Sequence, residues 1–332
     1  MIFVLCLSFS LDGFAQTEKE KPEKRFIGRV IKLDDQLDDL LDSKAQAEVL
    51  AGGFDWVEGP TWDKKNGHLL FSNIPKNRIH KWHPKEGVSI FLEPSGYDGA
   101  DRVTGREPGS NGLMFDAKGR LVVCDHGNRR VYRYEDGKKK TLADRFDGKR
   151  FNSPNDLVIH SSGDIYFTDP PYGLAKKTER EIDWNGVYVL RSKTGKVELL
   201  TKEFTRPNGI ALSPDEKKLY VAQSDRAKMI YKSFDVKKDG TINSGQLFFD
   251  ATKWVANDPG SADGMAVDAK GNIWATAPGG VLILSPEGNP LGRIMTGRPT
   301  ANCAFGEDGK TLFLTANKLL CRIQTKVKGL GF

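Results

Sequence analysis

Residues 203–212 read EFTRPNGIAL, in which an Asn-Gly pair comes directly before a short apolar run. Asn-Gly is the usual dipeptide of a tight turn. Versions of the same phrase recur along the chain, as GSNGLMFD (109–116), SPNDLVIH (153–160), RPNGIALS (206–213) and SADGMAVD (261–268). A polar leader residue therefore stands before the same kind of apolar run several times, which shows that the chain is internally repetitive.

Six segments align on this pattern. Each has a polar leader, an apolar run, a turn that usually contains Gly, and a second run rich in β-branched and aromatic residues, which is the pattern of a β-hairpin. The segments start at Glu58, Asn111, Asn155, Asn208, Asp263 and Asn302, with spacings of 39 to 55 residues. A third and a fourth strand-like run follow in most units, for example RRVYRYE (129–135) and KTLADRF (140–146). Repeats of this length with four strands each are typical of propeller blades.

The last unit has only three strand-like runs, whereas AEVLAGGFD (47–55) resembles a fourth strand and has no unit of its own. The sequence therefore predicts an all-β fold, a six-bladed β-propeller of four-stranded blades over residues 47–326, whose last blade is closed by an N-terminal strand. A closed ring removes the open sheet edge that favours aggregation. Residues 17–46 form an N-terminal extension, and the apolar residues near helical spacing at 26–45 predict a short amphipathic helix there. Residues 94–110 form a loop between the first two blades.

The N-terminal residues indicate export. An apolar run at 2–11, too short to span a membrane, precedes Ala15 and a charged stretch, which predicts a signal peptide over residues 1–16, although a basic start is missing. We therefore expect a periplasmic or secreted protein without a membrane span. The net charge of +6 is distributed along the chain, and no basic stripe predicts nucleic-acid binding. Cys124, Cys303 and Cys321 are expected to be buried free thiols, with a Cys303–Cys321 disulfide as the alternative.

The leader residues suggest a metal site. The innermost strand of each blade lines the central channel, so the six leaders should form a ring of side-chain oxygen atoms at one mouth. Carboxylates and amide carbonyls, with no His or Cys among the leaders, suit a hard cation such as Ca²⁺, with Mg²⁺ or Mn²⁺ as substitutes. The alternative interpretation is local, because Asn and Asp also cap turns through side-chain hydrogen bonds.

The second strand of each unit should return to the same mouth. Its end and the loop after it would carry Asp125 and His126 in the second unit, and Asp169 and Tyr172 in the third. His126 could shuttle a proton or contact a substrate, or it could be an ordinary surface histidine. The residues predicted to contact a substrate are Asn111, Asn155, His126, Asp169 and Tyr172.

Several longer phrases together resemble the gluconolactonase family, also called senescence marker protein/luciferin-regenerating enzyme-like. They are WVEGPTWD, GSNGLMFD, NSPNDLVIHSSGDIYFTDPPYG, RPNGIALSPD and SADGMAVDAKGNIW, and the likeness extends from about residue 27 to residue 325. The resemblance implies a six-bladed propeller that holds one catalytic divalent metal ion, usually calcium, and hydrolyses lactones.

The resemblance also assigns roles to individual residues. It implies that Glu58 and Asn208 bind the metal, that Asp263 both binds it and acts in catalysis, and that Asn155 lies beside metal and substrate. Some animal members carry an Arg two positions before that asparagine, where this chain has Ser153, so their sugar-acid specificity does not carry over. The histidine dyad of the paraoxonases, which share a similar metal cage, has no assignable match here.

The leading hypothesis is therefore metal-dependent hydrolysis of a small-molecule lactone. Asp263 would activate water, and Glu58, Asn155, Asn208 and Asp263 would hold one divalent ion. Ca²⁺ is the expected ion, with Mg²⁺, Mn²⁺ and Zn²⁺ as alternatives. The rival hypotheses are a non-catalytic propeller that binds carbohydrate or protein around a structural metal, and an esterase or phosphotriesterase with another substrate. The expected oligomeric state is monomer or dimer.

Overall fold

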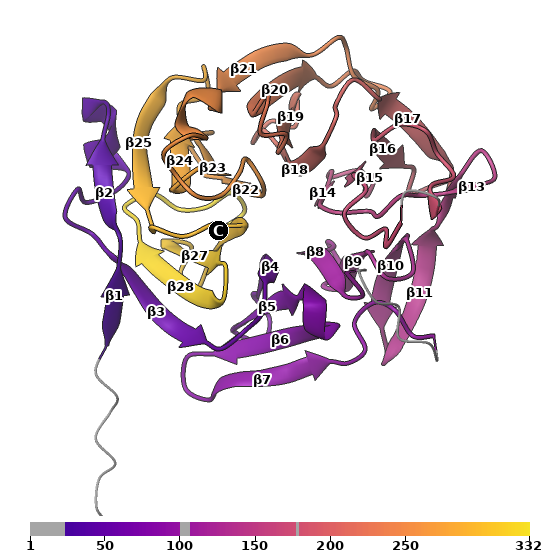
Figure 1. Cartoon of the computed structure of the whole chain (residues 1–332), viewed down its shortest axis with the longest axis horizontal. Helices are drawn as coiled ribbons and strands as arrows, with labels where there is room; N and C mark the ends of the chain where they lie inside the picture. Colours follow the sequence, from indigo (N-terminus) through magenta and orange to yellow (C-terminus); the bar gives the residue numbers. More distant parts are fainter. Residues whose placement is uncertain (1–23, 100–106, 177–178) are drawn as a thin grey trace, which may run out of the picture.

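The computed structural model describes residues 24–99, 107–176 and 179–332, and this part of the chain contains no α-helix. Six antiparallel sheets stand like blades around a central axis (Figure 1). Each blade begins with a strand at the axis and ends with a strand at the rim. The predicted all-β, six-bladed propeller is confirmed.

The first three blades follow the chain from the axis outward. Blade 1 contains β4 (Val57–Asp63), β5 (His68–Asn73), β6 (Arg78–His83) and β7 (Gly87–Leu92); blade 2 contains β8 (Ser110–Phe115), β9 (Leu121–Asp125), β10 (Arg130–Glu135) and β11 (Lys138–Ala143); blade 3 contains β14 (Leu157–Ile159), β15 (Ile165–Asp169), β16 (Gly186–Leu190) and β17 (Val197–Thr201). A small hairpin, β12 (Arg145–Phe146) and β13 (Lys149–Arg150), stands between blades 2 and 3, and the 3-10 turn η2 (Ile74–Lys76) follows β5.

The other three blades complete the ring. Blade 4 contains β18 (Pro207–Leu212), β19 (Lys218–Gln223), β20 (Ile230–Asp235) and β21 (Gln246–Asp250); blade 5 contains β22 (Met265–Val267), β23 (Ile273–Ala277), β24 (Gly280–Leu284) and β25 (Pro290–Met295), after the 3-10 turn η4 (Thr252–Trp254); blade 6 contains β26 (Asn302–Gly306), β27 (Thr311–Ala316) and β28 (Leu319–Gln324).

The fourth strand of blade 6 comes from the other end of the chain. Strand β3 (Ala47–Gly52) pairs antiparallel with β28, with Leu319 opposite Gly52 and Arg322 opposite Glu48. The Arg322 guanidinium also contacts the Glu48 carboxylate, with 2.9 Å between Nε and Oε2. The predicted closure of the last blade by an N-terminal strand is therefore confirmed.

The residues before β3 extend two blades instead of forming the predicted helix. Strand β1 (Arg25–Ile27) pairs with β3, and β2 (Arg29–Lys32) pairs with β25 of blade 5. Between them and β3 there is a single 3-10 turn, η1 (Asp35–Asp39), capped by the Asp34 side chain. The helical prediction was wrong because the apolar residues near helical spacing are divided between strands and this short turn. The predicted signal peptide, residues 1–16, lies outside the described residues.

Apolar side chains from facing blades form the core. Every residue of β5, β9, β15, β24 and β27 is buried. Cys124, Cys303 and Cys321 lie in this core as free thiols, as predicted. Burial raises the pKa of the Cys303 thiol to about 12, so this thiol is protonated and unreactive near neutral pH.

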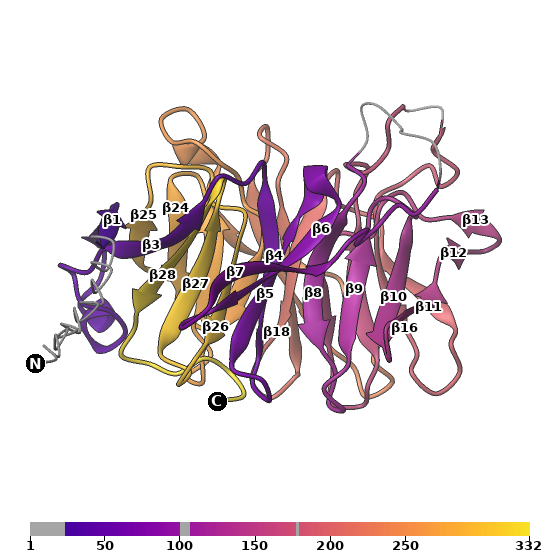
Figure 2. The same ribbon diagram turned by 90° about the horizontal axis from the view of Figure 1, so that it is seen from below.

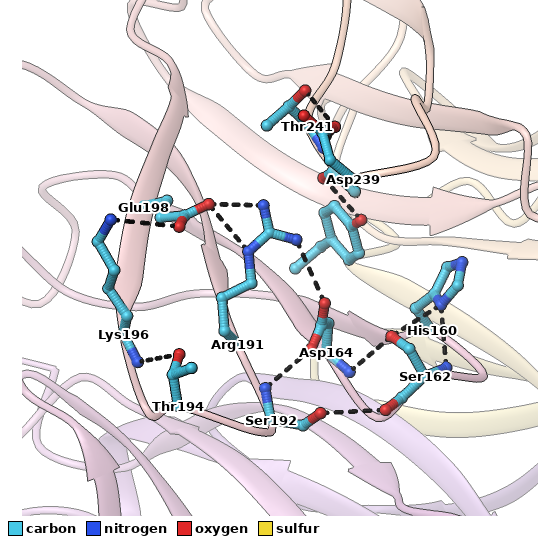
Figure 3. Close-up of polar contacts among 12 residues, drawn as sticks. His160, Ser162, Asp164, Arg191, Ser192, Thr194, Lys196, Glu198, Asp239 and Thr241 are labelled. Atoms are coloured by element: carbon cyan, nitrogen blue, oxygen red, sulfur yellow. Dashed lines mark hydrogen bonds and ion pairs between the residues drawn. The ribbon is translucent and has the colours of Figure 1, made fainter.

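Polar contacts at the surface stabilise blade 3 and join it to blade 4. Figure 3 shows Arg191 between two acids of blade 3, with its Nη1 3.2 Å from Asp164 Oδ2 and its Nε 2.9 Å from Glu198 Oε2. Beside it, the Tyr166 hydroxyl donates a hydrogen bond of 2.9 Å to the carbonyl of Gly240 in blade 4. The Tyr166 hydrogen bond therefore joins blade 3 to blade 4 near the outer surface.

The two mouths of the channel differ. The inner strands begin at the mouth where the leader residues lie, and the second strands return to it, as the pairs Val57–Asn73 and Ser110–Asp125 show. At the opposite mouth, the C-terminal residues 330–332 line a cavity of about 710 Å³. The C-terminus lies on the lower side of the disc in Figure 2. No helix among the described residues is both long enough and apolar enough to cross a membrane.

Candidate functional site

The six leader residues gather at one end of the channel and are all buried. Each side chain is less than one tenth exposed: Glu58, Asn111, Asn155, Asn208, Asp263 and Asn302. Their side chains interact across blades. Asn302 Nδ2 of blade 6 lies 3.4 Å from the carboxylate of Asp156 in blade 3. The sequence repeat therefore brings together oxygen-rich side chains from all six blades.

The glycine after the leader serves blade packing, not turn formation. The Asn-Gly pairs of blades 2 and 4 lie inside strands β8 and β18. A Cβ atom on Gly209 would lie 2.0 Å from the carbonyl oxygen of Asp263, far inside van der Waals contact. The Gly209 N–H instead donates to that oxygen over 3.1 Å, and Gly112 makes the same bond to Asn155 over 2.8 Å. The interpretation of these pairs as turn residues is therefore wrong, because neighbouring inner strands need glycine to approach so closely.

Hydroxyl groups of the second strands hold the leader backbones. Ser72 Oγ donates to the carbonyl of Asn111 over 2.8 Å, and Thr168 Oγ1 donates to the carbonyl of Asn208 over 2.7 Å. Each bond joins one blade to the leader of the following blade. Since both groups of each bond are buried, they restrict the leaders to one position.

Three buried acids at this end of the channel have raised pKa values. Burial raises the pKa of Glu58 to about 8, with a further contribution from the nearby Asp156 carboxylate. Burial and the charge of Glu58 raise the pKa of Asp263 well above its usual range. Burial likewise raises the pKa of Asp156 to about 7. Buried carboxylates that repel one another are stabilised in their ionised form by a cation.

Asn155 supplies a further oxygen. Its Oδ1 atom is buried and has no hydrogen-bond partner, which is unusual for a buried amide oxygen. Its Nδ2 atom lies 3.4 Å from Nε2 of His126. A free oxygen at the same end of the channel as buried carboxylates fits the preference of a hard divalent cation. No group of three or more His, Cys, Asp or Glu side chains suited to a metal occurs in the described ranges. The leaders predicted to hold the ion are instead two carboxylates and two amides, namely Glu58, Asp263, Asn155 and Asn208.

The other predicted contact residues have different positions. His126 is fully buried, and its Nε2 also lies 3.4 Å from Nδ2 of Asn111. The hydroxyl of Tyr172 is hydrogen-bonded to that of Ser224, and the ring lies 5.9 Å from the Arg206 guanidinium. The interpretation of His126 as an ordinary surface histidine is wrong, since it is wholly enclosed.

Asp169 supports the loop that carries Asn155. It has no exposed surface, and its two oxygens accept hydrogen bonds from the backbone N–H groups of Asn152 (2.8 Å) and Ser153 (2.7 Å). Ser153 stands at the position where some animal family members carry an arginine. Its hydroxyl accepts a hydrogen bond of 2.9 Å from the backbone N–H of Gly173, so it joins this loop to the loop after β15. Asp169 is thus positioned as a support for this loop, and its predicted contact with a substrate stays a prediction.

Two acids near the site were missed from the sequence. Asp156 directly follows the leader Asn155, and four of the other leaders are followed by glycine at this position. The Asp in place of Gly in SPNDLVIH was the sequence signal that could have identified it. Glu107 comes from the loop between blades 1 and 2, and its Oε2 lies 2.8 Å from Nδ1 of His126. No repeat pattern marks Glu107, because the loop has no counterpart in other blades.

Comparison with known protein families agrees with this arrangement. The model of the SMP-30/Gluconolactonase/LRE-like region matches residues 56–318, from the start of blade 1 into blade 6. The chain belongs to this family. The gluconolactonase of Zymomonas mobilis is 41% identical over 340 residues, which cover 99% of this chain and 95% of that protein. Pentonolactonase XacC of Haloferax volcanii is 26% identical over 264 residues, covering 78% of this chain and 80% of the relative.

Among solved structures, a gluconolactonase from Xanthomonas campestris superposes on this family member with a TM-score of 0.79 and 29% sequence identity. The match covers 92% of this chain and 99% of that chain. The suspected family resemblance is therefore confirmed over almost the whole propeller.

Proposed function

We propose that this protein hydrolyses a small-molecule lactone with the help of one divalent metal ion held at the leader end of the channel. The observation that carries the proposal is the buried, unpartnered Oδ1 of Asn155, at the same end of the channel as the buried carboxylates of Glu58 and Asp263. The names of the related lactonases support the reaction class.

The residues that would hold the metal are Glu58, Asn155, Asn208 and Asp263. All four offer oxygen, and none offers the nitrogen or sulfur that zinc prefers, so Ca²⁺ is the proposed ion, ahead of Mg²⁺ or Mn²⁺. A divalent cation bound there would polarise the lactone carbonyl and stabilise the negative charge that develops on its oxygen.

In the proposed reaction, Asp263 acts as the general base. Its carboxylate takes a proton from the attacking water as the water oxygen bonds to the lactone carbonyl carbon. The ring C–O bond then breaks, and the same proton passes to the leaving oxygen, which gives the open hydroxy acid. Asn155 and Asn208 are amides, which cannot accept that proton near neutral pH, so they orient groups and bind the ion. Asn111 and Tyr172 lie at the same mouth and are the proposed substrate contacts.

The test is hydrolysis of glucono-1,5-lactone and a panel of smaller and larger lactones, followed by pH-stat. Activity is measured before EDTA, after EDTA, and after Ca²⁺, Mg²⁺, Mn²⁺ or Zn²⁺ is restored. We expect EDTA to abolish turnover and Ca²⁺ to restore it. Metal binding without turnover of any lactone would refute the proposal and favour a binding propeller or another ester as substrate.

Asp263→Asn separates the base role from metal binding. This variant should keep a bound ion and lose a factor of about 10² to 10⁴ in kcat, the usual contribution of a general base. Asp225→Asn, on the loop after β19, is the matched control and should keep its activity. Wild-type turnover in Asp263→Asn with its metal retained would disprove the base role.

We also propose that the protein acts in the periplasm or outside the cell. The support is the apolar run at 2–11 and the following Ala15, which are typical of a cleaved signal. N-terminal sequencing of the mature protein from an extracytoplasmic fraction tests this. An intact N-terminus in a purely cytoplasmic protein would contradict it.

A further inference from the structure

His126 is enclosed at the leader mouth and uses both ring nitrogens. It follows β9 of blade 2 and has no exposed surface. Its Nδ1 lies 2.8 Å from Oε2 of Glu107, and its Nε2 lies 3.4 Å from Nδ2 of both Asn111 and Asn155. The ring thus connects a loop carboxylate to two of the leader amides.

The surroundings leave the ring little freedom. The backbone N–H of His126 donates to the backbone carbonyl of Gly109 over 3.2 Å. This bond connects the loop after β9 to the segment that carries Glu107. On the other side lies Gly173, where a Cβ atom would come within 2.8 Å of the His126 Cβ. The glycine therefore allows the loop after β15 to close over the histidine.

Glu107 determines which ring nitrogen carries the proton. An ionised carboxylate only accepts hydrogen bonds, so the nitrogen that faces it, Nδ1, must be the donor. In the neutral ring Nε2 is then an acceptor. The groups that face Nε2 are amide nitrogens, which are donors. Each donor therefore faces an acceptor from Glu107 through His126 to Asn155.

This pattern selects one orientation of the Asn155 amide. The nitrogen and oxygen ends of an amide are nearly equal in size, and hydrogen bonding decides between the two orientations. With Nδ2 held by His126, Oδ1 points elsewhere, and Oδ1 is the buried oxygen without a partner. The reversed amide would place oxygen against the acceptor lone pair of Nε2.

We propose that Glu107 and His126 form a positioning pair that keeps the Asn155 amide oxygen turned toward the cation. The inference rests on the proposed metal site, since it concerns how one of its oxygens is oriented. Neither residue of the pair contacts the ion or takes part in the chemical step. Outer partners that orient metal ligands typically affect affinity by about 10- to 100-fold.

The experiment is a double-mutant cycle on calcium affinity, measured by calorimetry with the EDTA-treated full chain. Glu107→Gln replaces the acceptor by an amide that can donate to Nδ1, which permits the reversed tautomer. It should weaken calcium binding by about 10-fold or more. Asn155→Asp offers oxygen at both ends, so its orientation no longer matters. In that background, Glu107→Gln should change the affinity by less than about twofold.

The cycle distinguishes orientation from charge. Glu107 is close enough for its charge to raise the pKa of Glu58 and Asp263, after larger contributions from burial and other acids, so its loss could also weaken a cation electrostatically. An equal loss of affinity in both backgrounds would mean a charge effect alone and would overturn the inference. No loss in either background would overturn it as well. Failure of the wild-type protein to bind any divalent ion would refute the metal site itself, a result visible before any variant is made.

A second measurement does not depend on the variants. The ¹⁵N chemical shifts of the imidazole nitrogens report the tautomer of each of the five histidines, and His126→Gln assigns the relevant signals. We expect metal-free wild-type protein to hold His126 with its proton on Nδ1, and Glu107→Gln to shift that population. A proton on Nε2 in the wild type would refute the positioning role.

Discussion

Glu58 should make the folding stability of the metal-free protein fall as the pH rises. Its pKa is raised from an ordinary value of 4.5 to about 8, chiefly by burial. As pH rises above 4.5, the unfolded chain gives up this proton while the folded chain keeps it, so folding stability falls. The loss is complete once the pH passes the folded pKa near 8.

The magnitude follows from the shift. Each pKa unit corresponds to about 1.4 kcal/mol, so the whole shift corresponds to roughly 5 kcal/mol. Between pH 5 and pH 8, Glu58 alone should then lower the free energy of unfolding by roughly 3 kcal/mol. The neutral, nearly isosteric Glu58→Gln variant should lack this contribution and show a shallower decline.

The assay is urea unfolding of EDTA-treated wild type and Glu58→Gln at half-unit steps from pH 5 to pH 8, with circular dichroism as the readout. Saturating Ca²⁺ should offset the wild-type decline, because a cation favours the ionised carboxylates and binds only the folded state. Parallel stability curves for the two metal-free proteins would refute the reasoning, since the raised pKa would then not belong to Glu58.

Three further substitutions test the packing around the site, each by chemical denaturation. Gly209→Ala should cost about 1–3 kcal/mol or more, because the new methyl group would meet the Asp263 carbonyl at 2.0 Å; unchanged stability would disprove the close-approach argument. Thr168→Val should cost about 1–3 kcal/mol by leaving the buried carbonyl of Asn208 without this donor, and a neutral result would show that another group replaces it. Tyr166→Phe should cost about 1 kcal/mol at the junction of blades 3 and 4, with no change in calcium affinity; a change in affinity would contradict its purely structural role.

The fold could be predicted because its information is repetitive. The apolar runs and turns recur six times, and the unmatched run at 47–55 indicated how the ring closes. Residues 26–45 were misjudged because apolar spacing in a short segment does not distinguish a helix from strands that pair with distant partners. Only the pairing of β2 with β25, more than 250 residues away, decides between them.

The candidate site was predictable only in part. The leaders could be found from the repeat, whereas the reason for the glycines after them lies in the close approach of neighbouring blades. Asp156 replaces one such glycine, and Glu107 reaches His126 from a loop without any repeat. The tautomer of His126 and the free oxygen of Asn155 depend on three-dimensional contacts that no spacing along the chain encodes.

The closure of blade 6 has a consequence for how the protein is made. Glu48 and Arg322, which join β3 to β28, are separated by 274 positions in the chain, so ribosomal synthesis is almost finished before they can meet. Five blades can form from contiguous sequence as the nascent chain emerges, while β3 waits without its partner. Formation of the complete ring is therefore a late, post-translational event with a large loop-closure entropy, and the unpaired β3 edge is the part of the nascent chain most in need of protection until then.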